Sequence, residues 1–153
     1  MRHTVIAVLL IVLVGWIVSA SPQWLLTGGE FVGGTLGGTL GAAGAIGLVS
    51  VVGPQLDASW AKTTLVISSI TLSCGLGSAG GVLATSALLG TEGSTMGCLI
   101  GGLLGGLLAA FSDPITYSIG IPEDVAEFIG FLALPLVPAI GATLGFHIGP
   151  AAK

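Results

Sequence analysis

Charge is what this sequence lacks most. Only 7% of its 153 residues are Asp, Glu, Lys or Arg, against about 25% in an ordinary soluble domain. The basic residues are Arg2, Lys62 and Lys153, and the net charge is −4. Nucleic acid and clusters of anionic lipid are therefore poor partners, because both are bound through groups of basic side chains. We expect no nucleic-acid partner.

Catalytic and metal-binding patterns are also missing. The two cysteines, Cys74 and Cys98, lie in apolar stretches and are too few for a disulfide framework or a zinc site. The sequence contains no Gly-x-Ser-x-Gly, His-Glu-x-x-His or Gly-x-x-x-x-Gly-Lys-Ser/Thr pattern, which would indicate a nucleophile, a catalytic zinc or a bound nucleotide. We therefore expect no enzyme activity, no catalytic residue, no cofactor and no metal.

Two ionisable residues lie within or beside apolar segments. His147 could act as a pH sensor or a metal ligand, but no second His, acid or Cys is close to it in the sequence, so we favour a packing or interfacial role. Thr27 and Glu30 have the spacing of a capping box, with Thr as the N-cap and Glu three residues later. We therefore expect a helix to begin at Thr27 and Glu30 to stabilise its first turn.

Apolar residues make up 53% of the chain, and the mean hydropathy is +1.08. Long apolar runs with few charges are typical of membrane-spanning helices. We predict an all-α, polytopic helical membrane protein with four spans, at about residues 27–52, 63–89, 95–111 and 122–149. The spans form two helical hairpins, residues 27–90 and residues 95–150, and residues between the last two spans form a loop.

Residues 1–20 have the layout of a signal peptide. Arg2 precedes an apolar run from Thr4 to Val18, and small residues follow it. Val18 and Ala20 flank a suitable cleavage site, so we expect the mature chain to begin at Ser21. The run is at the upper length limit for a signal, so an uncleaved signal-anchor helix is the alternative.

Small residues recur at every fourth position in the apolar segments. Such positions lie on one face of a helix, and a strip of glycine lets a second helix approach closely within a bilayer. Each interior glycine costs about 1 kcal/mol relative to alanine, so the strips indicate helix packing. The expected packing residues are Gly29, Gly33, Gly37, Gly41, Gly77, Gly81, Gly97, Gly101, Gly105, Gly141, Gly145 and Gly149.

The chain also matches itself. A shift of 68 residues aligns Thr27 with Thr95 and Gly33 with Gly101. We interpret this as a duplication, in which each hairpin is one copy and begins with its most regular glycine strip. Each copy has two spans, so the copies share one orientation, unlike the inverted repeats of many transporters.

The period-four glycines in paired helices, behind a signal-like start, resemble the glycine-zipper membrane proteins of bacterial envelopes. The resemblance is carried by Gly29 to Gly47, Gly97 to Gly106 and Ala139 to Gly145. It covers most of the chain after residue 27, although this chain has no lipidation cysteine and its spans are longer and more apolar. The resemblance implies an integral protein of the bacterial plasma (inner) membrane or cell envelope, with a role in envelope integrity, oligomerisation or pore formation.

The function we expect is structural or accessory. The chain would lie in the lipid bilayer and pack through its glycine faces with itself, as a homo-oligomer, or with a larger membrane complex. The alternative is a homo-oligomeric pore or small-solute channel. Few polar residues could line such a pore, which favours the structural role. The main ones are Thr35, Thr39, Ser68, Ser69, Thr71 and Ser73.

Overall fold

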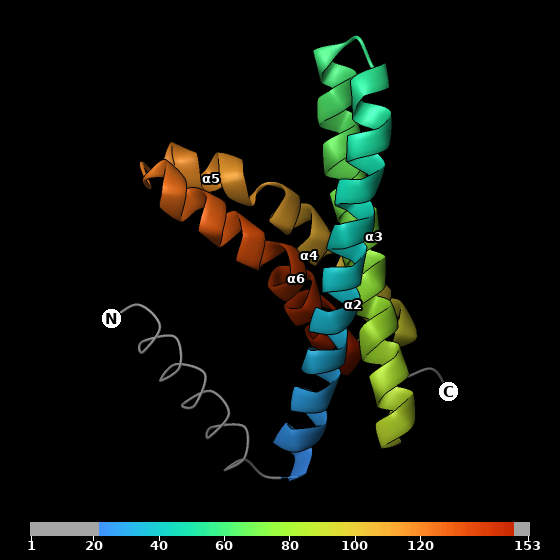
Figure 1. Ribbon diagram of the computed structural model, residues 1–153. Coiled ribbons are helices and arrows are strands. Elements are labelled where there is room, and N and C mark those ends of the chain that lie inside the picture. The colour runs from blue at the N-terminus through green and yellow to red at the C-terminus, as the bar shows by residue number, and fades with distance from the viewer. Residues whose placement is uncertain (1–21, 149–153) are drawn as a thin grey trace.

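The computed structural model describes residues 22–148, which form helices joined by short connections (Figure 1). The elements are α2 (Pro22–Val52), the 3-10 helix η1 (Gly53–Gln55), α3 (Ser59–Leu89), α4 (Thr95–Ala110), α5 (Ser112–Ser118) and α6 (Glu123–Ile148). No strand occurs within residues 22–148, which confirms the expected all-α class. The expected signal or anchor segment, residues 1–20, lies outside the described residues.

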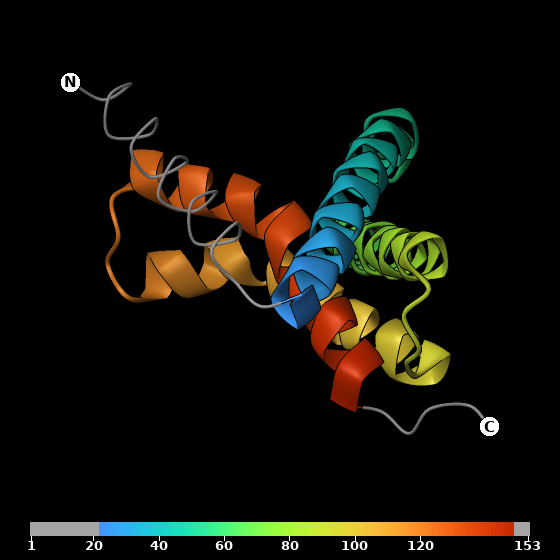
Figure 2. The ribbon, with the colours of Figure 1, turned by 90° about the horizontal axis from the view of Figure 1, so that it is seen from below.

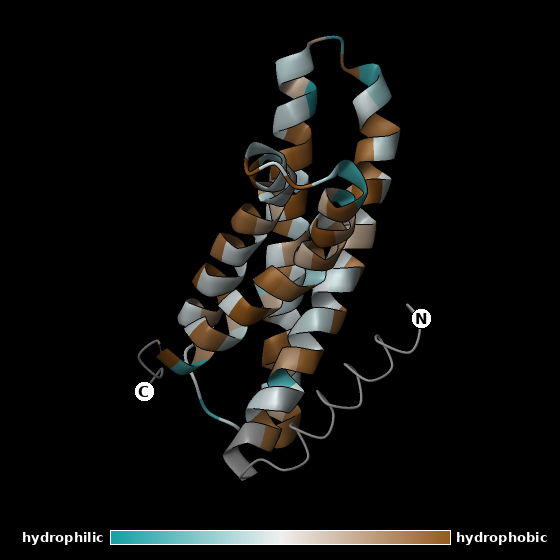
Figure 3. Cartoon of the chain, turned by 90° about the vertical axis from the view of Figure 1, so that its left-hand side faces the viewer, coloured by the Kyte–Doolittle hydropathy of each residue, from teal (hydrophilic) through white to brown (hydrophobic). Residues whose placement is uncertain are grey.

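Three helical segments are long and apolar enough to cross a membrane: Leu25–Gln55, Ser59–Leu89 and Glu123–Ile148. Hydrophobic residues recur along all of them (Figure 3). The helix α4 is also apolar but has only 16 residues, or about 24 Å at 1.5 Å per residue. That length is shorter than the hydrocarbon core of a bilayer, about 30 Å. The described residues thus contain three full-length candidate spans rather than the expected four.

The helices α2, α3, α4 and α6 form two antiparallel hairpins that cross one another. The helix α2 packs along α3, and α4 packs along α6. The second hairpin leans away from the first, so the two diverge toward the top of Figure 1. Where they cross, α3 contacts α4 and α2 contacts α6, and Figure 2 shows this crossing from below. The fold is therefore a crossed pair of hairpins with one shared contact region.

The interior is built mainly from small residues, and most of the large apolar residues face outward. Both cysteines are buried with free thiols. The side chains of Leu40 and Leu88 are 75% and 87% exposed; this would be unfavourable in water but not in lipid, whose tails are as apolar as leucine. The core cluster at the crossing consists of Ala79, Val82, Cys98, Ala142 and Phe146.

A tight turn joins α3 to α4. Gly90 ends α3 in the left-handed region, with φ of 67°, a conformation that costs glycine little because it has no Cβ. Ser94 caps α4, since its Oγ accepts a hydrogen bond from the backbone N–H of Gly97 at 3.0 Å. These two residues bring α4 back against α3 and place the turn beside the end of α6.

Two expectations about helix boundaries are wrong. The helix α2 begins at Pro22, so Thr27 lies inside it and Glu30 falls in its third turn instead of its first. Residues 112–118, expected to be part of a loop, form the helix α5. Pro114 does not prevent this, because it lies in the first turn, where its missing N–H removes no helical hydrogen bond.

Candidate functional site

A carboxylate is buried where α2, the α3–α4 turn and α6 meet. Glu30, on α2, has no exposed surface. The hydroxyl of Thr91 donates a hydrogen bond to its Oε1, and Nε2 of His147 lies 2.6 Å from its Oε2. The two partners are 61 and 117 residues away in the sequence. We call Glu30, Thr91 and His147 the polar cluster.

The partners of this carboxylate are themselves held in place. The backbone N–H of Thr91 donates to the carbonyl oxygen of Ser86 on α3 at 3.0 Å, and that of Ser94 donates to Phe146 on α6 at 2.8 Å. The Phe146 ring stands edge-on to the imidazole of His147, with 5.3 Å between the ring centroids. The α3–α4 turn is therefore attached to both α3 and α6 beside the cluster.

The cluster compensates a buried acid and joins the two hairpins. An unpaired carboxylate in apolar surroundings costs several kcal/mol, and the two contacts to Glu30 offset that cost. A hydrogen bond between imidazolium and carboxylate is charge-assisted, hence stronger than a neutral one. The side chain of His147 is 39% exposed, so the cluster connects the buried acid with the surface. Chemically, the contact is a hydrogen bond between carboxyl and imidazole.

The sequence-based interpretation of Glu30 is wrong, because this residue does not stabilise a first helical turn. For His147 the structure adds a partner that the sequence did not indicate, since folding brings the start of α2 to the end of α6 and places Glu30 beside it. The packing or interfacial role expected for His147 stays a prediction. One signal was available: Glu30 is the single charged residue of α2, and an acid inside an apolar helix usually has a partner. Within residues 22–148, no group of three or more His, Cys, Asp or Glu side chains could hold a metal ion.

Glycines line the contact between α2 and α3. A Cβ added at Gly33 would lie 2.7 Å from the carbonyl oxygen of Gly81, and one added at Gly37 would overlap the carbonyl of Gly77. The two helices thus meet backbone to backbone, and a methyl group at either position requires the backbone to move. We call the whole contact the α2–α3 seam; its residues are Gly33, Gly37, Gly41, Ser73, Gly77 and Gly81.

The second hairpin has a matching contact, the α4–α6 seam. Its residues are Gly97, Gly101, Gly105, Pro138, Gly141 and Gly145. A Cβ at Gly105 would lie 2.6 Å from the Cα of Pro138. The pair Gly33–Gly81 becomes the pair Gly97–Gly145 when both numbers rise by 64. The contacts therefore relate the hairpins by 64 residues, whereas the sequence match gives 68, about one helical turn more.

Ten of the expected packing glycines lie in these two seams, and the remaining two stand apart. Gly29 faces a side chain instead of a backbone, since a Cβ there would lie 2.9 Å from Cδ1 of Leu89. Gly149 lies outside the described residues.

Further glycines join one hairpin to the other. A Cβ at Gly75 of α3 would lie 2.9 Å from the carbonyl oxygen of Gly102 on α4, and one at Gly106 would lie 2.6 Å from that of Thr71. These positions are not among the expected packing residues. Gly102 and Gly106 each follow a glycine of the α4–α6 seam by one position, so they form a second row that faces α3. The two adjacent rows let α4 pack closely against both α6 and α3.

Most of the hydroxyls considered as pore lining are bonded to their own helix. Thr35 donates to the carbonyl of Phe31 at 2.9 Å, and Thr39 donates to that of Thr35 at 2.8 Å. Ser68 does the same one turn back along α3, at 2.6 Å. A hydroxyl that bonds its own backbone is satisfied without water, so these residues are compatible with lipid contact.

Comparison with protein-family models, with curated proteins and with solved structures finds no match for this chain. Its function must therefore be inferred from the polar cluster, the two seams and the outer surface.

Proposed function

We propose that this chain is a structural or accessory membrane protein, similar in kind to the glycine-zipper proteins of bacterial envelopes, which packs with itself or with a larger membrane complex. The observation that carries the proposal is the close contact along both seams, which leaves no conduit between the paired helices. The outer surface carries large apolar side chains, which suit lipid or another apolar helix. No catalytic step is part of the proposal.

We further propose that α4 and α5 cross the bilayer together as the fourth span, after removal of residues 1–20 as a signal peptide. The helical residues 95–118, interrupted at Phe111, would extend about 36 Å, enough for the hydrocarbon core. At the interruption, Oγ of Ser112 donates to the carbonyl of Ala109 at 2.8 Å. That bond satisfies a backbone group next to the break, as the membrane interior requires.

Open glycines on the first hairpin support the proposed assembly. A Cβ added at Gly44 or Gly47 of α2, or at Gly80 of α3, would meet nothing within 4 Å. In a membrane, a glycine with no neighbour leaves a flat surface that a further helix can approach. We propose that these glycines contact a helix from a second copy or from another membrane protein.

The substitution Gly80→Leu is expected to weaken assembly and to leave the chain itself stable. Leucine would fill the flat surface of α3 and keep the partner helix away, yet it is favourable in lipid. Native mass spectrometry in mild detergent should show a complex for the wild type and a smaller species for the variant. Thermal unfolding of the isolated chain should be unchanged.

Val32→Leu is the matched control, because Val32 is 51% exposed and already presents a side chain to its surroundings. It should assemble like the wild type. A wild-type protein that is monomeric and free of partners would contradict the proposed assembly, as would a Gly80→Leu variant that keeps the complex.

Liposomes that contain the assembled protein are expected to stay impermeable to ions and small solutes. The seams are closed, and Thr35 and Thr39 already bond their own helix. A dye-release or ion-flux assay measures this, once insertion and oligomeric state have been verified. Flux that changes in a Thr39→Val variant would replace the structural proposal with a pore.

A further inference from the structure

The helix α6 has a packed half and an outlying half, and two prolines stand at the boundary. Gly38 of α2 faces Pro135, and Gly105 of α4 faces Pro138, so the second half of α6 is held by both hairpins. The first half, residues 123–134, packs on α5 and leans away from the first hairpin (Figure 1). The prolines therefore mark the point at which α6 leaves the crossing.

Both prolines weaken α6 at this boundary. Proline has no N–H, so Pro135 and Pro138 donate no hydrogen bond to the carbonyls of Phe131 and Leu134, four residues earlier. Sharp bends of helices occur mainly at such positions, because the missing bonds lower the resistance to bending. The helix α6 is therefore easiest to bend where it leaves the crossing.

The other strand of this hairpin is interrupted at a similar depth. The helix α4 ends at Ala110, and Phe111 separates it from α5, with φ of −100° and ψ of 5°. The α4–α6 seam pairs Gly105 with Pro138, so its antiparallel register places Phe111 within about two turns of the prolines. Because both connections are interrupted, residues 112–134 can move as one unit. We call these residues the tip.

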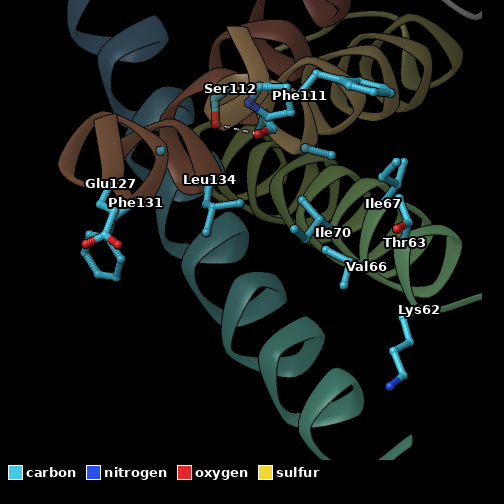
Figure 4. Close-up of a pocket in the computed structure, with 14 residues that line it drawn as sticks. Lys62, Thr63, Val66, Ile67, Ile70, Phe111, Ser112, Glu127, Phe131 and Leu134 are labelled. Atoms are coloured by element: carbon cyan, nitrogen blue, oxygen red, sulfur yellow. Dashed lines mark hydrogen bonds between the residues drawn. The ribbon is translucent and has the colours of Figure 1, made fainter. Parts of the chain in front are cut away.

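The tip forms one wall of a groove of about 650 Å³, and α3 forms the opposite wall. Figure 4 shows Val66 and Ile70 of α3 on one side of the groove and Phe131 of α6 on the other. These facing side chains are apolar, and lipid tails are equally apolar. Movement of the tip toward α3 thus exchanges lipid contacts for protein contacts of similar energy, so neither position is strongly favoured.

We propose that the tip is a jointed arm, which swings about Phe111 and the two prolines and so opens and closes the groove to the surrounding lipid. Glu127 precedes Pro135 by eight residues, about 12 Å along the helix. A change of bend by about 20°, a size for which proline is the usual cause, moves Glu127 by about 4 Å. The two seams and the polar cluster keep the rest of the chain in place.

Double electron–electron resonance on the full chain in liposomes measures this movement. Spin labels are attached in a Lys62→Cys, Glu127→Cys variant, since both residues are exposed and lie on opposite walls of the groove. Labelled chains are diluted with excess unlabelled chain, so that distances between copies do not contribute. The native cysteines are buried, and labelled wild-type chain provides their background signal.

A second label pair gives the reference width. Leu40→Cys and Leu88→Cys place labels at exposed positions on α2 and α3, which the α2–α3 seam holds together. We expect the distances across the groove to spread over about 4 Å more than the distances in this reference pair. Equal widths for the two pairs would show a rigid second hairpin and would overturn the proposal.

Proline variants test the joint itself. Pro135→Ala combined with Pro138→Ala should narrow the groove distances to the reference width, because alanine restores both N–H groups and the helical bonds that they form. Pro122→Ala is the matched control: Pro122 precedes the first residue of α6, so the wild-type width should persist. A spread that survives in the double proline variant would contradict a joint at these residues.

Discussion

Gly37→Ala is expected to destabilise the chain by about 3 kcal/mol, the upper end of the usual cost of overpacking. The added methyl group would overlap the backbone carbonyl of Gly77 across the α2–α3 seam. A backbone cannot turn aside as a flexible side chain can, so α2 and α3 must separate. Separation loses the dispersion contacts along the whole seam. Unfolding by a denaturing detergent in mixed micelles measures the loss.

Gly44→Ala and Gly47→Ala are the matched controls for Gly37→Ala, because they make the same change on the same helix. Both positions are open within the single chain, so in the monomeric protein, without the proposed partner helix, alanine should be neutral or stabilising, by up to about 1 kcal/mol from helix propensity. Gly101→Ala should repeat the large loss in the α4–α6 seam. Equal stability of Gly37→Ala and Gly44→Ala would mean that the seam does not hold the helices together.

His147→Ala is expected to cost about 3 kcal/mol, the upper end of the usual penalty when a buried polar group loses a hydrogen-bond partner. Glu30 has no exposed surface, so its carboxylate would retain only the Thr91 hydroxyl. Glu30→Gln should cost less, about 1 kcal/mol. The amide keeps the shape and one acceptor oxygen, and His147, which is 39% exposed, retains access to its surroundings. Micelle unfolding of both variants measures this asymmetry.

The double variant gives the sharper outcome. Adding Glu30→Gln to His147→Ala removes the unpaired buried charge, so the double variant should be more stable than His147→Ala alone. Additive losses would show that the carboxylate does not depend on His147.

The sequence predicted the features that repeat at short spacing. The helices were predicted because apolar runs and period-four glycines are local patterns, and the boundaries of α4 agree to within one residue. The sequence did not predict which residues of the facing helix each row of glycines contacts. The offset of 68 residues comes from aligning identical residues in the sequence. The offset of 64 residues comes from the contacts, because Gly33 meets Gly81 in the first hairpin as Gly97 meets Gly145 in the second. Glycine spacing fixes a face but not which turn of the partner lies against it.

The polar cluster and α5 could not be predicted, for two different reasons. Glu30 and His147 are 117 residues apart, and only the crossing of the hairpins brings them together. The local pattern around Thr27 favoured a helix start, but α2 extends back to Pro22. Ser112 and Pro114 have the composition of a helix stop, yet the same residue types begin a helix equally well, and packing against α6 selects that outcome.

The two hairpins differ in length, and the surrounding bilayer must respond. The helices α2 and α3 have 31 residues each, about 46 Å, while the proposed fourth span, α4 with α5, extends about 36 Å. Such hydrophobic mismatch is relieved by tilt or by local thickening and thinning of the lipid, at fractions of a kcal/mol per Å. We expect the bilayer to be thicker beside the first hairpin than beside α4 and α5. Two copies that pack with their long hairpins side by side deform a smaller total area of lipid than two separate copies do. The elastic energy of the membrane would therefore add to direct helix contact in favouring assembly.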